Sequence, residues 1–169
     1  PRIRGVCESV FERPQAELGI ATVYDVAHNT AKLESHEVGG VRRRVCVHRK
    51  GATRAFPPGS PELPARYRVT GQPVIIGGSM ETGSYALAGV ASGGRSFYST
   101  AHGSGRTMSR SRARKLVHGR ELQDRLAARG ILVHAASLPG LAEEAGFAYK
   151  CVDDVAEATE QIERSLMTR

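Results

Sequence analysis

The chain has 169 residues, a formal net charge of +7 and an aromatic content of 5%. This length suits one domain of ordinary size, and the positive charge favours a polyanionic partner. The three cysteines show no CxxC spacing, which argues against a disulfide scaffold or a zinc knuckle and favours a reducing cytoplasm. Because no apolar stretch is long enough to cross a bilayer, we expect no membrane partner.

The first half of the chain predicts short elements separated by loops. Residues 7–18 are interrupted by a proline and predict the end of a helix and a turn. Residues 20–38 begin with β-branched apolar side chains and predict a short helix around His28. Residues 41–50 alternate apolar and basic side chains, the period of a half-buried strand. The four prolines within residues 56–64 predict a loop.

The middle of the chain predicts two strands, a loop and a long helix. Residues 72–80 predict a buried strand that runs into a glycine turn, and residues 84–90 predict a second apolar strand. Residues 93–105 are rich in glycine and serine and predict a loop. The longest helical pattern covers residues 106–130, interrupted at Gly119.

The remaining segments predict a short strand over residues 131–137 and a terminal amphipathic helix over residues 153–167. Mixed strands and helices without regular βαβ spacing indicate an α+β fold. Basic residues gather within residues 42–50 and 106–115, whereas the chain beyond Pro139 is acidic. This asymmetry predicts a basic working face and an acidic peripheral helix.

Two glycine-rich segments, residues 75–84 and 99–106, are candidates for anion binding. Glycine lets the backbone approach a ligand closely, and consecutive N–H groups form anion-binding nests. Ser79, Ser84 and Ser104 would add hydroxyl donors to a phosphate. Neither segment is a Walker A motif or a dinucleotide fingerprint, and ordinary turns are the alternative interpretation.

His102 lies in the second glycine-rich segment, two residues before Ser104 and four before Arg106. A neutral imidazole is a competent nucleophile at phosphorus, and nearby arginines stabilise charge that develops on phosphate oxygens. An exposed loop histidine is the alternative. His28 and His36 are eight residues apart, too far for an i,i+4 metal pair, so His28 needs ligand partners from elsewhere or is structural.

The basic run "HRKGATRAF" (residues 48–56) favours contacts with phosphates. Arg49, Lys50 and Arg54 suit such contacts, which position a nucleic acid without reading its sequence. The alternative for any one charge run is a solvated face. The scarcity of aromatic residues argues against a base-stacking platform of the RRM type.

Five segments together resemble the RtcB family of RNA-splicing ligases and follow one another in the family's order. They read "DVAHNTAKLESH", "VHRKGATRAF", "QPVIIGGSMETGSYALAG", "STAHGSGRTMSR" and "LAEEAGFAYKCVDDV". The resemblance implies that residues 1–169 are the carboxy-terminal part of an RtcB-like ligase domain. Because the chain begins at Pro1 rather than at a methionine, we expect it to be a piece of a longer protein.

The resemblance also implies roles for single residues. His102 would attack the α-phosphate of GTP and become guanylylated, and His28 would be a Mn²⁺ ligand. The nucleotide would contact Ser79, Ser84, Ser104, Gly105 and Tyr149. The RNA phosphates would contact Asn29, Lys50, Arg106 and Arg110.

The implied reaction is a GTP-dependent RNA ligation in tRNA splicing or RNA repair. It joins an RNA 2′,3′-cyclic phosphate or 3′-phosphate end to a 5′-hydroxyl end, and a small partner, archease, promotes turnover. The family's amino-terminal metal ligands and its terminal lysine–glycine pair have no counterpart here, and Glu81 replaces a usual glycine. Two alternatives therefore stand: a non-catalytic RNA- or phosphate-binding module, and a fragment whose amino-terminal half arrives as a separate chain.

Overall fold

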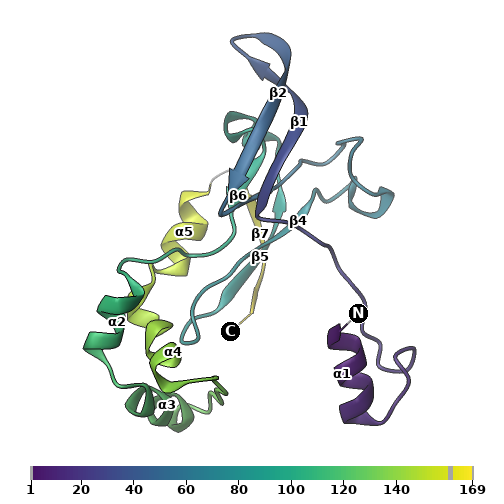
Figure 1. Cartoon of the computed structure of the whole chain (residues 1–169). Helices are drawn as coiled ribbons and strands as arrows, with labels where there is room; N and C mark the ends of the chain where they lie inside the picture. Colours follow the sequence, from purple (N-terminus) through teal and green to yellow (C-terminus); the bar gives the residue numbers. More distant parts are fainter. Residues whose placement is uncertain (1, 160–161, 169) are drawn as a thin grey trace.

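The computed structural model describes residues 2–159 and the backbone of residues 162–168. Helix α1 (Arg2–Phe11) lies apart from the other elements, to which an extended segment connects it (Figure 1). None of its residues is buried. The predicted helix end and turn within residues 7–18 are confirmed, because α1 ends at Phe11 and turns follow.

A long antiparallel hairpin follows, formed by β1 (Asn29–Val38) and β2 (Val41–Lys50). Gly39 and Gly40 connect the strands with φ values of 60° and 76°, the backbone of a two-residue hairpin turn. The strand predicted over residues 41–50 is confirmed. The short helix predicted around His28 is wrong, because residues 29–38 pair with β2 and residues 20–28 form no helix.

Five further strands form two small sheets. Strand β3 (Ala52–Arg54) pairs with β6 (Ser99–Ala101), and β5 (Ser84–Gly89) lies between β4 (Pro73–Ile76) and β7 (Ile162–Thr168). The strands predicted within residues 72–80 and 84–90 are thereby confirmed.

Two loop predictions have different outcomes. The proline-rich segment 56–64 is a loop, as predicted. The segment 93–105 is only partly loop, because it contains β6 and most of the 3₁₀ helix η2 (Ala91–Ser96). A second 3₁₀ helix, η1 (Ala65–Tyr67), follows the proline-rich loop.

The long helical pattern of residues 106–130 forms two helices, α2 (Arg110–Leu116) and α3 (Gly119–Ala128). The backbone is extended at Val117, which places that side chain in a buried cluster with Leu122, Leu126 and Leu141. Helix α4 (Leu138–Glu143) contributes Leu141 to this cluster, so α4 packs against α2 and α3. At the break between the two helices, Val117 thus adds to the buried apolar area of this cluster.

The carboxy-terminal segments correct two predictions. Residues 131–137 form no strand, although Ile131 and Val133 pack against the cluster around Leu122. The predicted terminal helix is only α5 (Val152–Ala158), which follows the 3₁₀ helix η3 (Gly146–Ala148). The chain then returns as β7 along the edge of β5.

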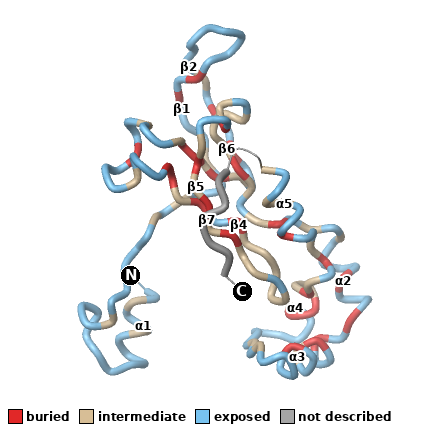
Figure 2. Tube along the Cα trace, turned by 180° about the vertical axis from the view of Figure 1, so that it is seen from behind, coloured by how far each residue is buried: buried red, intermediate tan, exposed pale blue. Residues whose placement is uncertain are grey.

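A second buried cluster joins the three-stranded sheet to α5. It includes Val74, Ile76, Tyr85, Leu87 and Val152. Figure 2 shows buried segments of the chain at β4 and β5. Helices and small antiparallel sheets together confirm the predicted α+β class. Within the described ranges, none of the helices has the length and apolar character needed to cross a bilayer.

Candidate functional site

The two glycine-rich segments meet side by side. Gly77 and Gly103 form a parallel β-bridge, and the Gly77 N–H donates to the His102 carbonyl over 3.3 Å. The Ser104 N–H donates to the Gly77 carbonyl over 2.8 Å, and the Ser104 hydroxyl donates to the same oxygen over 3.3 Å. These bonds bury Ser104 and fix the backbone on both sides of His102.

His102 and His28 stack at this junction. Their ring centroids are 4.7 Å apart with an interplanar angle of 13°, and both residues are exposed. A Cβ atom on Gly51 would lie 3.5 Å from the His102 Nε2 atom, so the end of β2 passes beside the ring. The Gly51 N–H donates to the Asn29 side-chain oxygen over 3.3 Å. The base of the hairpin thus brings Asn29 and His28 to His102.

The first glycine-rich segment is held by its own hydroxyl groups. The Gly78 N–H donates to the Ser84 hydroxyl oxygen over 3.2 Å, and the Ser79 N–H donates to the Thr82 hydroxyl oxygen over 2.8 Å. The Glu81 N–H donates to the Ser79 hydroxyl oxygen over 3.2 Å. Ser79 and Ser84 therefore shape the loop in addition to their expected role at a nucleotide.

Replacing Gly78 by alanine is expected to open this loop. A Cβ atom on Gly78 would lie 2.1 Å from the Gly83 carbonyl oxygen, a contact that only a backbone shift can relieve. We expect a loss of about 1–3 kcal/mol in the free energy of unfolding, measured by urea denaturation. Gly77→Ala is the matched control, because its Cβ would meet only the His102 carbonyl oxygen at 3.9 Å. Equal losses for both variants would contradict this account of the loop.

Glu81 ties the same loop to neighbouring elements. Its carboxylate accepts from the Gly146 N–H over 3.0 Å and pairs with Arg129 at 3.0 Å and Arg125 at 3.6 Å. The negative charge of Glu81 is therefore compensated by two guanidinium groups, that of Arg125 in α3 and that of Arg129 just after it.

Arg106 and Tyr149 form a second polar group beside Ser104 and Gly105. The Arg106 guanidinium lies over the Tyr149 ring at 4.9 Å and donates to the Tyr149 hydroxyl oxygen over 3.0 Å. The Tyr149 hydroxyl donates to a Glu144 carboxylate oxygen. The Lys150 N–H donates to the Gly105 carbonyl over 3.0 Å, which holds this tyrosine segment against the His102 loop.

Two acidic residues at the end of α4, Glu143 and Glu144, form ion pairs with the basic helix α2. Arg110 pairs with Glu144 at 3.5 Å and with Glu143 at 3.7 Å, and Arg114 pairs with Glu143 at 3.4 Å. The sequence predicted a basic working face and an acidic peripheral helix, but Glu143 and Glu144 instead pair with the basic helix α2. The sequence contained one signal for this packing: Glu143 directly follows Leu141 and Ala142, the buried apolar residues of α4.

Arg49 is a buried structural residue, contrary to its predicted contact with phosphate. Its guanidinium donates two hydrogen bonds to Glu34, over 2.7 and 2.9 Å, and another to the Ser99 hydroxyl oxygen over 2.9 Å. His36 Nε2 lies 2.8 Å from the same Glu34 carboxylate. Burial by itself raises the pKa of Glu34, but hydrogen bonds and charge from Arg49 and His36 outweigh it and hold the pKa below its usual value. Arg54, which was also predicted to contact phosphate, pairs with Glu62 at 3.0 Å.

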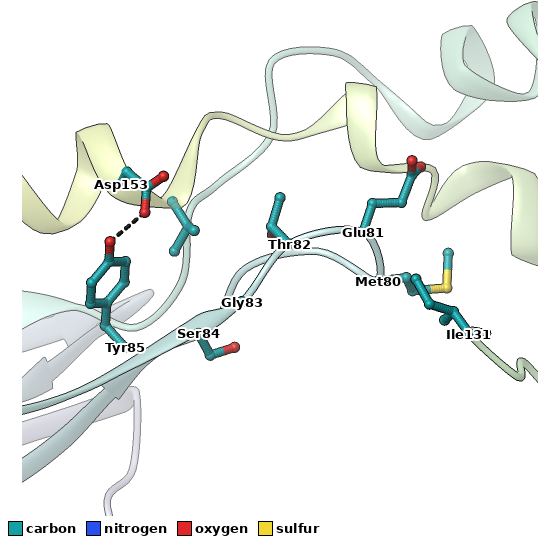
Figure 3. A pocket seen from close by; sticks show the side chains of 9 residues that line it. Met80, Glu81, Thr82, Gly83, Ser84, Tyr85, Ile131 and Asp153 are labelled. Carbon is teal, nitrogen blue, oxygen red and sulfur yellow. Dashed lines mark hydrogen bonds between the residues drawn. The ribbon is translucent and has the colours of Figure 1, made fainter. Parts of the chain in front are cut away.

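A hollow of about 460 Å³ lies beside the loop of residues 80–85 (Figure 3). Met80, Ile131 and the hydrogen-bonded pair of Tyr85 and Asp153 contribute to its wall. Of the residues predicted to form a site, only Ser84 lines it, and its side chain points to the other side of the strand from Tyr85 (Figure 3). The hollow is thus distinct from the junction around His102.

The residues described here do not assemble a manganese site by themselves. No group of three or more His, Cys, Asp or Glu side chains within the described ranges is placed to hold a metal ion. A Mn²⁺ ion at His28 would need most of its ligands from outside this part of the structure. Cys7, Cys46 and Cys151 are free thiols.

Comparison with known proteins gives one consistent family. The family model described as "tRNA-splicing ligase RtcB" matches residues 1–168. Relatives named tRNA-splicing ligase RtcB are 50% identical over 92% of the chain in Aeropyrum pernix and 51% identical over 94% in Thermococcus kodakarensis. An RNA-splicing ligase RtcB of Mycobacterium bovis is 53% identical over 82% of the chain.

The chain corresponds to 32%, 33% and 32% of the lengths of these three relatives, about a third of each. The family match nevertheless extends across nearly the whole chain, and it includes both glycine-rich segments and the hairpin base that meet at His102. The chain therefore belongs to the RtcB family of tRNA-splicing ligases.

Proposed function

We propose that this chain is the carboxy-terminal catalytic portion of a GTP-dependent RNA ligase. The reaction joins an RNA 3′-phosphate or 2′,3′-cyclic phosphate end to a 5′-hydroxyl end, in tRNA splicing or RNA repair. The observation that carries the proposal is the exposed His102 imidazole, which lies in one of two glycine-rich segments that are hydrogen-bonded to each other and which stacks on His28. Family membership supports the assignment to RNA ligation.

In the first step, the His102 Nε2 atom attacks the α-phosphorus of GTP. A P–N bond forms, the P–O bond to the β-phosphate breaks, and pyrophosphate leaves with its electron pair. A 2′,3′-cyclic phosphate end is first opened by water to a 3′-phosphate. An oxygen of the RNA 3′-phosphate then attacks the GMP phosphorus, a P–O bond forms, the P–N bond breaks and the imidazole is restored. The RNA 5′-hydroxyl attacks the activated phosphorus, loses its proton to solvent and releases GMP.

The remaining site residues divide between the two substrates. We propose Ser79, Ser84, Ser104, Gly105 and Tyr149 as contacts of the guanosine nucleotide. Asn29 and Lys50 at the hairpin base, with Arg106 and Arg110 near α2, would hold RNA phosphates. Cationic side chains there would offset the charge that builds on phosphate oxygens in the transition state.

Residues outside this part of the structure would complete the metal site and the active complex. His28 would contribute one ligand to Mn²⁺, which we propose as the metal, and the family's amino-terminal half would supply the others. Archease is the proposed partner that promotes turnover, and the cytoplasm is the proposed location. The free thiols agree with a reducing compartment.

The test is intact-protein mass after incubation with GTP and Mn²⁺, with and without the separately produced amino-terminal part of a relative. We expect a guanylate adduct that trypsin locates to residues 96–106, the peptide bounded by Arg95 and Arg106. A phosphoramidate is acid-labile and alkali-stable, which separates it from a serine ester. Absence of the adduct under both conditions would overturn the proposal.

One observation favours the alternative of a non-catalytic RNA- or phosphate-binding module. Within the described part of the chain no three-ligand metal group forms, although the glycine-rich junction is complete. A module of this kind would bind RNA in a salt-dependent manner and form no adduct even with the amino-terminal part present.

Another observation favours a fragment that needs a separate amino-terminal half. Ile3, Val6 and Val10 recur at helical spacing along α1 and are 78%, 62% and 68% exposed. An apolar stripe left in water usually marks an interface. Adduct formation only after addition of the amino-terminal part would establish this alternative.

A further inference from the structure

The hairpin carries a row of basic side chains on one face. Arg42, Arg44, His48 and Lys50 lie at every second or fourth position of β2 and are exposed, whereas Val47 and Arg49 between them are buried. Side chains two residues apart share a face of a strand. The distance of 3.4 Å between the Cys46 Sγ and His48 Nε2 atoms agrees with that common face.

These cations differ from those of α2 in their surroundings. Arg110 and Arg114 are paired with carboxylates of the acidic segment. In the part of the chain that the structure covers, Arg42, Arg44 and Lys50 make no ion pair; Glu37, opposite Arg42 in the hairpin register, is the acidic residue on this face. The hairpin face is therefore the better placed of the two basic clusters to receive an anion.

The row leads to His102. Lys50 is followed by Gly51, which passes beside the His102 ring, and Arg42 lies at the far end near the Gly39–Gly40 turn. At about 3.4 Å per residue, the row extends about 27 Å away from the junction. Arg42 and Arg44, and likewise His48 and Lys50, are two positions and therefore about 7 Å apart, close to the spacing of successive phosphates in an extended nucleic acid strand.

We propose that Arg42, Arg44, His48 and Lys50 form a track for the phosphates of single-stranded RNA as it leaves the junction at His102. This proposal rests on the proposed function and specifies where the substrate lies beyond its reacting end. The face carries no Phe, Tyr or Trp, so binding along it uses phosphates rather than stacked bases and is independent of base sequence.

Cys46 provides a reporter on the track, because it is exposed between Arg44 and His48. Alkylation by iodoacetamide, followed by peptide mass mapping, would be compared with and without single-stranded RNA that ends in a 3′-phosphate. We expect RNA to slow alkylation of Cys46 at least about threefold and to leave Cys151, the exposed thiol beside α5, unchanged. An RNA of three nucleotides should protect less than one of eight.

Single substitutions provide the second measurement. Arg42→Ala and Arg44→Ala should each reduce the salt dependence of RNA affinity, the slope of log K against log salt, by about 0.7. Arg43→Ala is the matched control, because Arg43 is an exposed arginine of the same strand that points to the other face. Its slope should stay unchanged.

The outcomes distinguish this proposal from the proposed function. RNA that binds without protecting Cys46, or equal slope changes for the three arginine variants, would overturn the track even if His102 forms its adduct. Protection of Cys46 without any adduct would support the track and count against the ligase mechanism. Protection by an acidic polyglutamate peptide but not by RNA would assign the face to a protein partner and overturn the proposal.

Discussion

Replacing His102 by alanine is expected to abolish the guanylate adduct. If His102 is the group that attacks the α-phosphorus, the alanine variant lacks the nucleophile, and removal of a covalent nucleophile costs on the order of 10⁶ in rate. The adduct should therefore fall below detection by intact mass and by transfer of radiolabel from α-labelled GTP. The fold should persist, because His102 is exposed and its backbone carbonyl, not its ring, bonds to Gly77.

Two further histidine variants make this prediction specific. His134→Ala removes an exposed imidazole from the segment that follows α3 and should leave the adduct yield unchanged. His28→Ala removes the ring stacked on His102 and should slow adduct formation without abolishing it. An adduct that persists at full yield in His102→Ala would show that another residue is the nucleophile.

Replacing Glu34 by alanine is expected to cost about 3–5 kcal/mol in the free energy of unfolding, because it leaves the Arg49 guanidinium buried without a counterion. Only 1% of the Arg49 side chain and 3% of the Glu34 side chain are exposed. Urea denaturation measures the loss. Glu37→Ala removes an exposed carboxylate from the same strand and should change stability by less than about 0.5 kcal/mol.

A double variant checks the cause of that loss. Glu34→Leu combined with Arg49→Met replaces the buried pair by apolar side chains, which is often neutral and should restore most of the stability. If the double variant were as unstable as Glu34→Ala, the loss would come from altered packing or from the lost His36–Glu34 hydrogen bond rather than from an unpaired Arg49 charge.

The same carboxylate gives stability a dependence on pH. Because Arg49 and His36 hold the pKa of Glu34 below its usual value, its contribution is complete above the usual carboxyl pKa. The contribution declines as the pH falls through the lowered pKa of the folded state. Glu34→Ala should therefore flatten the loss of stability on acidification relative to the wild-type chain.

The sequence predicted elements best where the local pattern agreed with the tertiary contacts. Residues 41–50 alternate apolar and basic side chains and form β2, and the proline-rich segment is a loop. The helical pattern around His28 failed because pairing across the Gly39–Gly40 turn outweighs local propensity. Likewise, the terminal helix ends at Ala158 and the chain returns along β5, a long-range pairing with no local signal.

For the candidate site as well, the sequence predicted the features that a local motif specifies and missed those that depend on tertiary contacts. Motifs identified both glycine-rich segments, and the structure brings them together at Gly77 and Gly103. Charge alone did not separate a buried arginine from an exposed one: Arg49 and Lys50 are neighbours, yet Arg49 is committed to Glu34 and Lys50 is exposed. The alternation of side chains along β2 does distinguish the two residues, because Arg49 lies on the same face of the strand as the buried Val47 and Lys50 lies on the other.

Glu143 and Glu144 already pair with arginines of α2. A phosphate that binds these arginines therefore competes with existing ion pairs. An anion that approaches the Arg110 Nε atom competes with Glu143 and Glu144, which already pair with it, and their carboxylates repel the newcomer. Salt weakens the displaced pairs as well as the new one. The affinity of this face for RNA should therefore depend on salt concentration much less steeply than its number of arginines suggests. Glu143 and Glu144 compete with the substrate phosphates for these arginines.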